Sequence, residues 1–171
     1  MADARTRVMV RTAMFAALTC VATFIIKIPT PGTGGYIHPG DALVILSGIV
    51  LGPIYGAAAA GIGSALADLF GGYFFYAPIT LLIKGIIALV SGLIFHGAVF
   101  GKIQADRVRC ILCGLFATVF VALGYFIFEY FIYGTSAVAS IPANLIQGFS
   151  GLIISTLMLP FVRRHIIKQD R

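Results

Sequence analysis

Three ionisable side chains lie within or at the end of long apolar stretches of the sequence: Asp68, Lys84 and Glu129. An ionised group at membrane depth costs roughly 2.5–3.5 kcal/mol on insertion scales, so residues of this kind are functional candidates. The chemistry open to them is ion pairing, proton transfer or hydrogen bonding to a polar ligand. The structural alternative is that Lys84 pairs with Asp68 or Glu129, which neutralises both charges without any ligand.

Two side-chain amides add hydrogen-bonding capacity near the C-terminus. Asn144 and Gln147 are three residues apart in an apolar segment, so they project onto one face of the predicted helix. Amides offer donors and acceptors that suit the edge of a heterocycle, although they also form hydrogen bonds between membrane helices. Because Glu129 and Tyr133 are predicted near the same end of the neighbouring helix, the pattern favours a ligand site.

The connection at residues 29–40 is rich in Gly and Pro, as expected of a loop that covers a site. Tyr36 is its candidate for stacking on a ligand, and Asp41 directly after it is a candidate pocket residue or charge partner. His38 has no companion ligands at metal-binding spacing, which predicts an ordinary loop residue. The sequence predicts neither a metal site nor a bound cofactor.

Other function classes find less support. The sequence has no Gly-x-x-x-x-Gly-Lys-Ser/Thr loop, so ATP-driven work would need an ATPase in another subunit. It has no set of nucleophile, acid–base pair or metal ligands for an integral membrane enzyme, and no basic stripe for nucleic acid. A stand-alone proton-coupled carrier that uses Asp68 or Glu129 stays open, although no clear inverted repeat is visible.

The elements that must position these residues are membrane helices. The 171 residues are 60% hydrophobic and 11% charged, and their mean hydropathy is +1.03, which predicts an all-α integral membrane protein. One membrane domain, residues 1–171, is predicted to contain six apolar segments, roughly 8–28, 41–51, 53–71, 77–99, 110–133 and 141–162. The second is short for a span, so it must tilt or be shielded by its neighbours.

The 12 Lys and Arg residues set the predicted orientation. Most of them cluster before the first segment, between the fourth and fifth, and after the sixth. An even number of spans places all three clusters on one side, which predicts a compact six-helix bundle with both termini cytoplasmic, in a bacterial-type cytoplasmic membrane. The N-terminal arginines also fit a signal peptide, but the long apolar run favours a retained first helix.

Small residues at helical spacing predict close helix packing. Gly56, Ala60 and Ser64 share one line of the third segment, where packing inside the bundle is the favoured interpretation. Ala13 and Ala17, four residues apart in the first segment, form a second small face. From spacing alone, that face fits docking to a partner and packing inside the bundle equally well.

Five stretches of this sequence, in this order, resemble the substrate-binding S components of energy-coupling factor (ECF) vitamin transporters. They begin Tyr36-Ile-His-Pro-Gly-Asp41, Leu51-Gly-Pro-Ile-Tyr-Gly56, Gly61-Ile-Gly-Ser, Ala77-Pro-Ile-Thr and Ile141-Pro-Ala-Asn144. The resemblance covers nearly the whole chain. It implies a subunit that binds a vitamin or precursor at the outer side and topples to release it inside. Two ATPases and a transmembrane T subunit would supply the energy.

The resemblance also implies roles for individual residues. Ala13 and Ala17 match the Ala-x-x-x-Ala face that docks on the T subunit, and residues 29–40 match the substrate lid. Polar residues of the last three helices would line the pocket. This singles out Lys84, Glu129, Asn144 and Gln147.

The S components that the sequence resembles most are those for hydroxymethylpyrimidine, a thiamin precursor, or for vitamin B6. Glu129 could accept a hydrogen bond from an aminopyrimidine or pair with a cationic ring. Tryptophan is absent, which disfavours intact thiamin, because thiamin-binding members use tryptophan stacking. Riboflavin, folate and pantothenate stay open.

Overall fold

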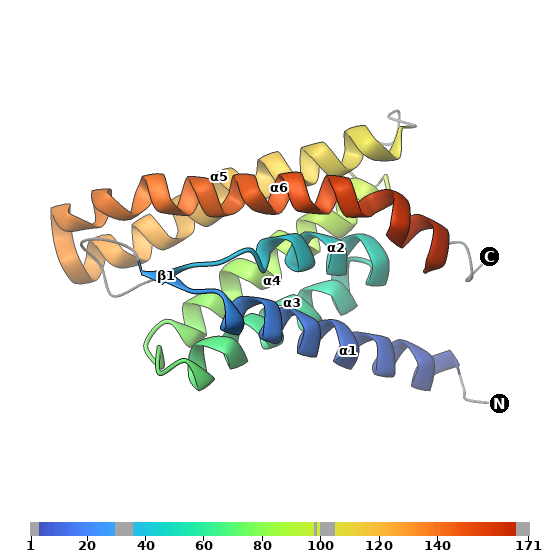
Figure 1. Ribbon diagram of the computed structural model, residues 1–171, viewed down its shortest axis with the longest axis horizontal. Coiled ribbons are helices and arrows are strands. Elements are labelled where there is room, and N and C mark those ends of the chain that lie inside the picture. Colours follow the sequence, from blue (N-terminus) through green and yellow to red (C-terminus); the bar gives the residue numbers. More distant parts are fainter. Residues whose placement is uncertain (1–3, 30–35, 98, 100–104, 167–171) are drawn as a thin grey trace.

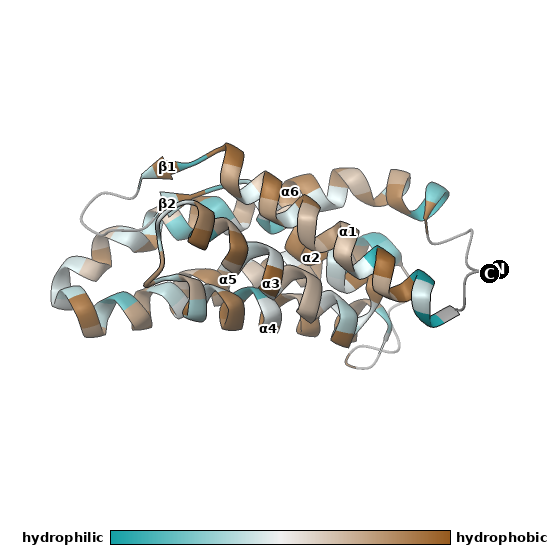
Figure 2. Cartoon of the chain, turned by 90° about the horizontal axis from the view of Figure 1, so that it is seen from below, coloured by the Kyte–Doolittle hydropathy of each residue, from teal (hydrophilic) through white to brown (hydrophobic). Residues whose placement is uncertain are grey.

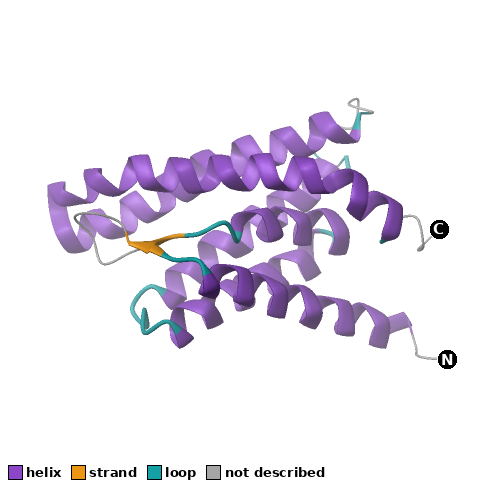
Figure 3. Cartoon of the chain, in the orientation of Figure 1, coloured by secondary structure: helices purple, strands orange, loops and turns teal. Residues whose placement is uncertain are grey.

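The computed structural model describes residues 4–29, 36–97, 99 and 105–166. Its helices are α1 (Ala4–Ile25), α2 (Asp41–Leu51), α3 (Pro53–Phe70), α4 (Ala77–Phe95), α5 (Asp106–Tyr133) and α6 (Ser140–His165). A short 3-10 helix, η1 (Gly134–Ala139), joins α5 to α6, and β1 (Ile28–Pro29) pairs with β2 (Tyr36–Ile37) in an antiparallel hairpin (Figure 3). The predicted lid at residues 29–40 is described only in part, because residues 30–35 lie outside the described chain.

The predicted apolar segments overlap these helices, with ends that differ by up to four residues. At some ends polar residues continue a helix beyond its apolar part, whereas α1 and α4 end before the predicted segments do. At the start of α5, for example, Asp106, Arg107 and Arg109 are helical although the predicted segment begins at Cys110.

The helices differ in whether they are long and apolar enough to span a membrane. Four described stretches are long and apolar enough to cross a membrane: Arg5–Ile25, Pro53–Phe70, Ala77–Phe95, and Asp106–His165, which contains α5 and α6. Helix α2 is apolar but has only 11 residues. It packs against α3, α4 and α6, so its neighbours shield it, as expected for so short a segment.

Small residues let the helices approach closely. Gly63 of α3 lies against the backbone carbonyl of Ala16 in α1, and a side chain at Gly63 would overlap that carbonyl. Gly56, Ala60 and Ser64 are all buried on α3. The small-residue line of α3 therefore packs inside the bundle, where close contact replaces the hydrophobic drive available in water.

The two ends of the bundle differ in chemistry. The start of α1 and the end of α6 lie together at the right of Figure 1, and hydrophilic residues gather there (Figure 2). The hairpin, the α3–α4 connection and η1 lie at the opposite end. Since α3 and α5 finish there and α4 and α6 begin there, polar residues near four helix ends are brought together.

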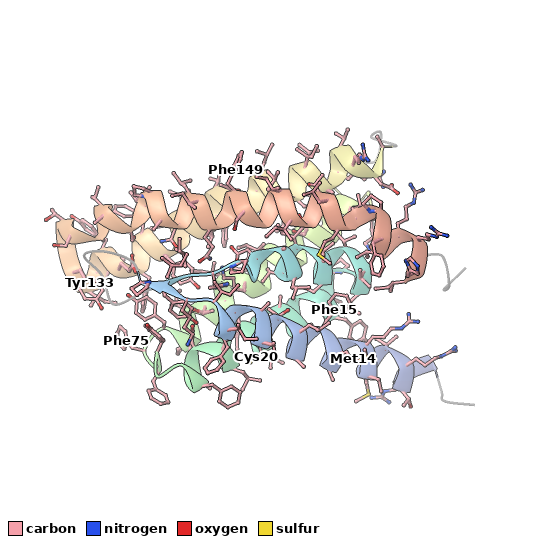
Figure 4. All side chains as sticks on the ribbon, viewed as in Figure 1. Met14, Phe15, Cys20, Phe75, Tyr133 and Phe149 are labelled. Carbon is pink, nitrogen blue, oxygen red and sulfur yellow. The ribbon has the colours of Figure 1, made fainter. Side chains whose placement is uncertain are left out.

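Helix α1 lies at the periphery of the bundle, packed on α3 and, to a lesser extent, on α2. Figure 4 shows Met14 pointing away from the bundle, whereas the partly buried Phe15 packs against the core. Ala13 and Ala17 are exposed on α1, so its small-residue face is not used for packing within this chain.

Candidate ligand-binding site

A polar cavity lies at the end of the bundle where α3 and α5 finish and α4 and α6 begin. The free space inside it is about 20 Å³, room for about one water molecule, so the lining side chains nearly close it in this conformation. Its lining combines tyrosines, acids, an amide, a hydroxyl and an imidazole. These residues are Tyr36, His38, Asp68, Tyr76, Thr80, Tyr125, Glu129 and Asn144.

Asp68 brings a buried carboxylate to the cavity from the last turn of α3. The Tyr36 hydroxyl donates a hydrogen bond of 2.6 Å to its Oδ1, whereas its Oδ2 has no hydrogen-bond partner among the described residues. Thr80 also interacts with this carboxylate, but its hydrogen bond, at 2.9 Å, is with the Tyr125 hydroxyl. Burial and the neighbouring Asp68 raise the pKa of Tyr36, so its phenol keeps its proton. One oxygen of Asp68 is left for a donor in the cavity.

Glu129 brings a second carboxylate, 2% exposed, from the last turns of α5. The Tyr76 hydroxyl donates to its Oε1 at 3.1 Å, and its buried Oε2 has no hydrogen-bond partner within the described chain. Tyr133, at the end of α5 (Figure 4), interacts with the Tyr76 hydroxyl and is 37% exposed. Because buried polar atoms are nearly always paired, Oε2 marks a place for a ligand donor.

A second polar cluster lies beside the cavity and connects α4, α2 and α6. The Lys84 ammonium pairs with Asp41 Oδ1 at 2.5 Å, and both side chains are 0% exposed. The Gln147 amide donates to Asp41 Oδ2 at 3.1 Å, and its Oε1 accepts from the backbone N–H of His38 at 3.0 Å. We call Lys84, Asp41, Gln147 and His38 the buried network. Both oxygens of its carboxylate have partners.

His38 joins the buried network to the cavity. Its Nδ1 accepts a hydrogen bond from the backbone N–H of Gly40 at 3.1 Å. Burial, with the nearby Lys84 charge, lowers the pKa of His38 to about 3, so the imidazole is neutral near pH 7. The prediction of an ordinary loop residue was wrong. Its contact with Gln147 joins positions 109 residues apart, which local spacing cannot reveal.

Lys27 lies at the rim beside the hairpin. Its ammonium is 4.5 Å from the ring centroid of Phe24, 4.9 Å from that of Tyr36 and 5.2 Å from that of Tyr73. These cation–π contacts hold the Tyr36 ring while its hydroxyl bonds to Asp68. The charge of Lys27 is thus engaged with aromatic faces at the rim.

The structure divides the residues predicted from sequence into two groups. Those in the cavity lining are Tyr36, Asp68, Glu129 and Asn144. Lys84 and Gln147 belong instead to the buried network with Asp41. Lys84 pairs with Asp41, which the sequence analysis named as a possible charge partner, and not with Asp68 or Glu129, because α2 packs on both α4 and α6 and places Asp41 beside the lysine. The predicted site residue Tyr133 lies outside both groups and is 37% exposed.

Besides His38, three lining residues were missed from sequence: Tyr76, Thr80 and Tyr125. A signal for two of them was present. Thr80 precedes Lys84 by four residues and Tyr125 precedes Glu129 by four, so each shares a helix face with a charged candidate.

A buried polar cavity inside an apolar helical bundle is a place where a membrane protein can hold a small solute. The chain belongs to the ECF-type riboflavin transporter S component family, whose sequence profile matches residues 3–164. It is therefore a multi-pass membrane protein and the substrate-binding subunit of an ECF transporter. The family consists of transport proteins and not enzymes.

Two further similarities accompany this assignment. An uncharacterized Pyrococcus woesei protein, encoded in a gap 3' region, is 36% identical over 135 residues, which cover 78% of this chain and 86% of that protein. A solved structure, described as the S component of a bacterial ECF transporter, has the same fold with a TM-score of 0.63. It is 21% identical, and the match covers 98% of this chain and 99% of that one.

Proposed function

We propose that this chain binds a B-group vitamin or vitamin precursor with high affinity and delivers it to an ECF importer. The observation that carries the proposal is the pair of buried oxygens, Asp68 Oδ2 and Glu129 Oε2, without hydrogen-bond partners among the described residues. Each can accept a hydrogen bond from an N–H or O–H group of a ligand. The Asn144 amide, also in the lining, can donate and accept.

The substrate we favour is hydroxymethylpyrimidine or a B6 vitamer. Both are single rings that carry hydrogen-bond donors, and a small ring requires the least displacement of the side chains that now nearly fill the cavity. The aromatic faces of Tyr36, Tyr76 and Tyr125 can pack against such a ring. The amino group of an aminopyrimidine would find its acceptor at Asp68 or Glu129.

Riboflavin is the second candidate, because the family is named for riboflavin transport. Its three fused rings and ribityl chain would require a wider cavity than the described residues enclose. A riboflavin complex would therefore form only with Tyr36 and His38 displaced from their present positions.

The proposed assembly has six spans, both termini on the cytoplasmic side of the cell membrane, and a T subunit with two ATPases as partners. The orientation is supported by the basic residues that gather where α1 starts and α6 finishes. The T subunit would dock on the exposed small face of α1, around Ala13 and Ala17, and the S component would topple to release its substrate inside.

Bulky substitutions test the docking face. Ala13→Trp or Ala17→Trp should leave substrate binding unchanged, because both positions face away from the cavity, but should abolish ATP-dependent uptake in proteoliposomes that contain the T subunit and ATPases. Ala58→Trp, on an exposed position of α3, is the matched control and should transport normally. Normal uptake by the α1 variants would refute the docking assignment.

The competing function is a stand-alone proton-coupled carrier in which Asp68 or Glu129 carries the proton. The discriminating experiment starts with native mass spectrometry of the detergent-purified protein to identify any bound small molecule. Titration with B-group vitamins and precursors, followed by thermal unfolding, then gives the affinity. A stoichiometric vitamin-like ligand supports our proposal. Uptake of that ligand into vesicles that contain this chain alone, driven by a proton gradient, would favour the carrier.

A further inference from the structure

We propose that the cavity selects neutral or cationic ligands and rejects their phosphate monoesters. The basis is that the cavity carries two carboxylates, whereas Lys84, the buried cation beside it, is already neutralised by Asp41. The inference rests on the proposed function, since it specifies the charge of the vitamin-type ligand.

The negative charge of the lining is only partly offset by its neighbours, since Lys84 and Lys27 act on Asp68 through space. Asp68 is 3% exposed and Glu129 is 2% exposed, and each receives one hydrogen bond from a tyrosine hydroxyl. A phenol donor stabilises an ionised carboxylate but brings no positive charge. A ligand anion would therefore face two carboxylates, with neither lysine among the lining residues, in a site largely shielded from water.

Lys84 cannot serve as the counterion for such an anion. Its ammonium pairs with one oxygen of Asp41, while Gln147 holds the other oxygen, so the carboxylate is fixed in place. On a further side the ammonium lies 5.5 Å from the ring centroid of Tyr125, which itself lines the cavity. Lys84 has further N–H donors, but its charge is already balanced by Asp41, so it offers an anion little net attraction.

The other basic groups of the described chain are also unsuited to the role. His38 is neutral and uses its Nδ1 to accept from Gly40. Lys27 lies against the rings of Phe24, Tyr36 and Tyr73 at the rim. The described arginines are in α1 before its apolar run, at the start of α5 and at the end of α6, the termini that lie opposite the cavity.

Helix N-termini are the remaining means of binding phosphate, because their free N–H groups attract anions. Helices α4 and α6 do begin at this end, but their first amides are occupied. The Ala77 N–H donates to the Tyr73 carbonyl, and the Ser140 N–H, which follows η1 directly, donates to the Ala137 carbonyl. The preceding turns thus occupy the first amide of each of these two helices.

The test compares ligand pairs that differ only in a phosphate group. The probes are hydroxymethylpyrimidine and its monophosphate, pyridoxal and pyridoxal 5'-phosphate, and riboflavin and its 5'-phosphate. Titration calorimetry on the detergent-purified, ligand-free full chain gives both dissociation constants. In the pair whose free form binds, we expect the monoester to bind at least 100-fold more weakly.

Variants separate charge from size. Asp68→Asn and Glu129→Gln each remove one negative charge at nearly constant volume, and either should reduce the ratio of the two constants about tenfold. Asp106→Asn is the matched control. It removes the same charge from a carboxylate that pairs with Arg163 at the other end of the bundle, and it should leave the ratio unchanged.

Each outcome decides a separate point. A monoester that binds the wild-type chain within threefold of its free form would overturn the charge inference while the proposed function stands. A ratio that neither cavity variant alters would show steric exclusion, which also overturns it. Absence of binding by any free form would refute the substrate proposal, and the inference would fail with it.

Discussion

Two clusters of buried polar residues lie side by side in this S component, and their hydrogen bonding differs. In the buried network, both oxygens of Asp41 are occupied, one by Lys84 and the other by Gln147. In the cavity, Asp68 and Glu129 each keep one oxygen without a partner in the described chain. The carboxylate of the first cluster is fully paired without a ligand, and the two carboxylates of the second are not.

The comparison shows that a buried charge in a membrane helix does not by itself mark a binding site. Lys84 and Glu129 are both almost fully buried in apolar helices. From the sequence alone, both are predicted as binding residues on the same grounds. What separates them is whether each polar atom has a partner. We therefore assign Lys84 a structural role beside the site and Glu129 a role in substrate binding.

The largest expected effect is on the stability of the buried network. Lys84→Met leaves Asp41 as an unpaired buried charge, which should lower the free energy of unfolding by about 3–5 kcal/mol. The double variant Asp41→Asn with Lys84→Met should recover most of that loss, because it leaves no charge behind. Denaturation in detergent measures both. If Lys84→Met alone were as stable as the wild type, the buried network would not have the structural role that distinguishes it from the cavity.

The corresponding change in the cavity should act on affinity. Glu129→Gln keeps the side-chain volume but replaces the acceptor Oε2 with an amide or a weaker acceptor, so the preferred probe should bind about 10- to 100-fold more weakly, equivalent to about 1.4–2.8 kcal/mol. The free energy of unfolding without ligand should stay the same or rise, since an unsatisfied buried oxygen is relieved. Unchanged affinity would remove Glu129 from the site.

The two amides of α6 provide a matched pair. Gln147→Ala removes a donor to Asp41 and an acceptor for His38, so it should cost about 1–3 kcal/mol of stability. Asn144→Ala should weaken ligand binding with little effect on unfolding, because Asn144 lines the cavity. Thermal unfolding and titration of both variants check this. If Asn144→Ala instead lowered stability and Gln147→Ala weakened ligand binding, the two residues would have the opposite roles.

A smaller effect should appear in the dependence of stability on pH. The pKa of His38 is lowered to about 3 in the fold, against about 6.5 when unfolded. The unfolded chain therefore binds the extra proton first, so this contribution to stability is complete above pH 6.5 and is lost as pH falls toward 3. At pH 5.5 the loss should be about 1.4 kcal/mol, and His38→Gln should abolish it. If the free energy of unfolding of the wild type and of His38→Gln changed with pH in the same way, this role of His38 would be contradicted.

Hydropathy and charge predicted much of the helix framework because lipid demands continuous apolar segments and leaves charged residues at their ends. Hydropathy and charge could not predict which polar residues contact one another. Lys84 meets Asp41 across 43 positions and His38 meets Gln147 across 109, through packing of the short helix α2 that no local pattern encodes. Tyr125, by contrast, could have been found from its helical spacing to Glu129.

The most direct test is a structure of the chain bound to the tightest ligand of the probe panel. Our account predicts that ligand donors lie within hydrogen-bond distance of Asp68 Oδ2 or Glu129 Oε2, while Lys84 stays paired with Asp41. A ligand held by the Lys84 ammonium, with Asp68 and Glu129 making no contact to it, would contradict the account.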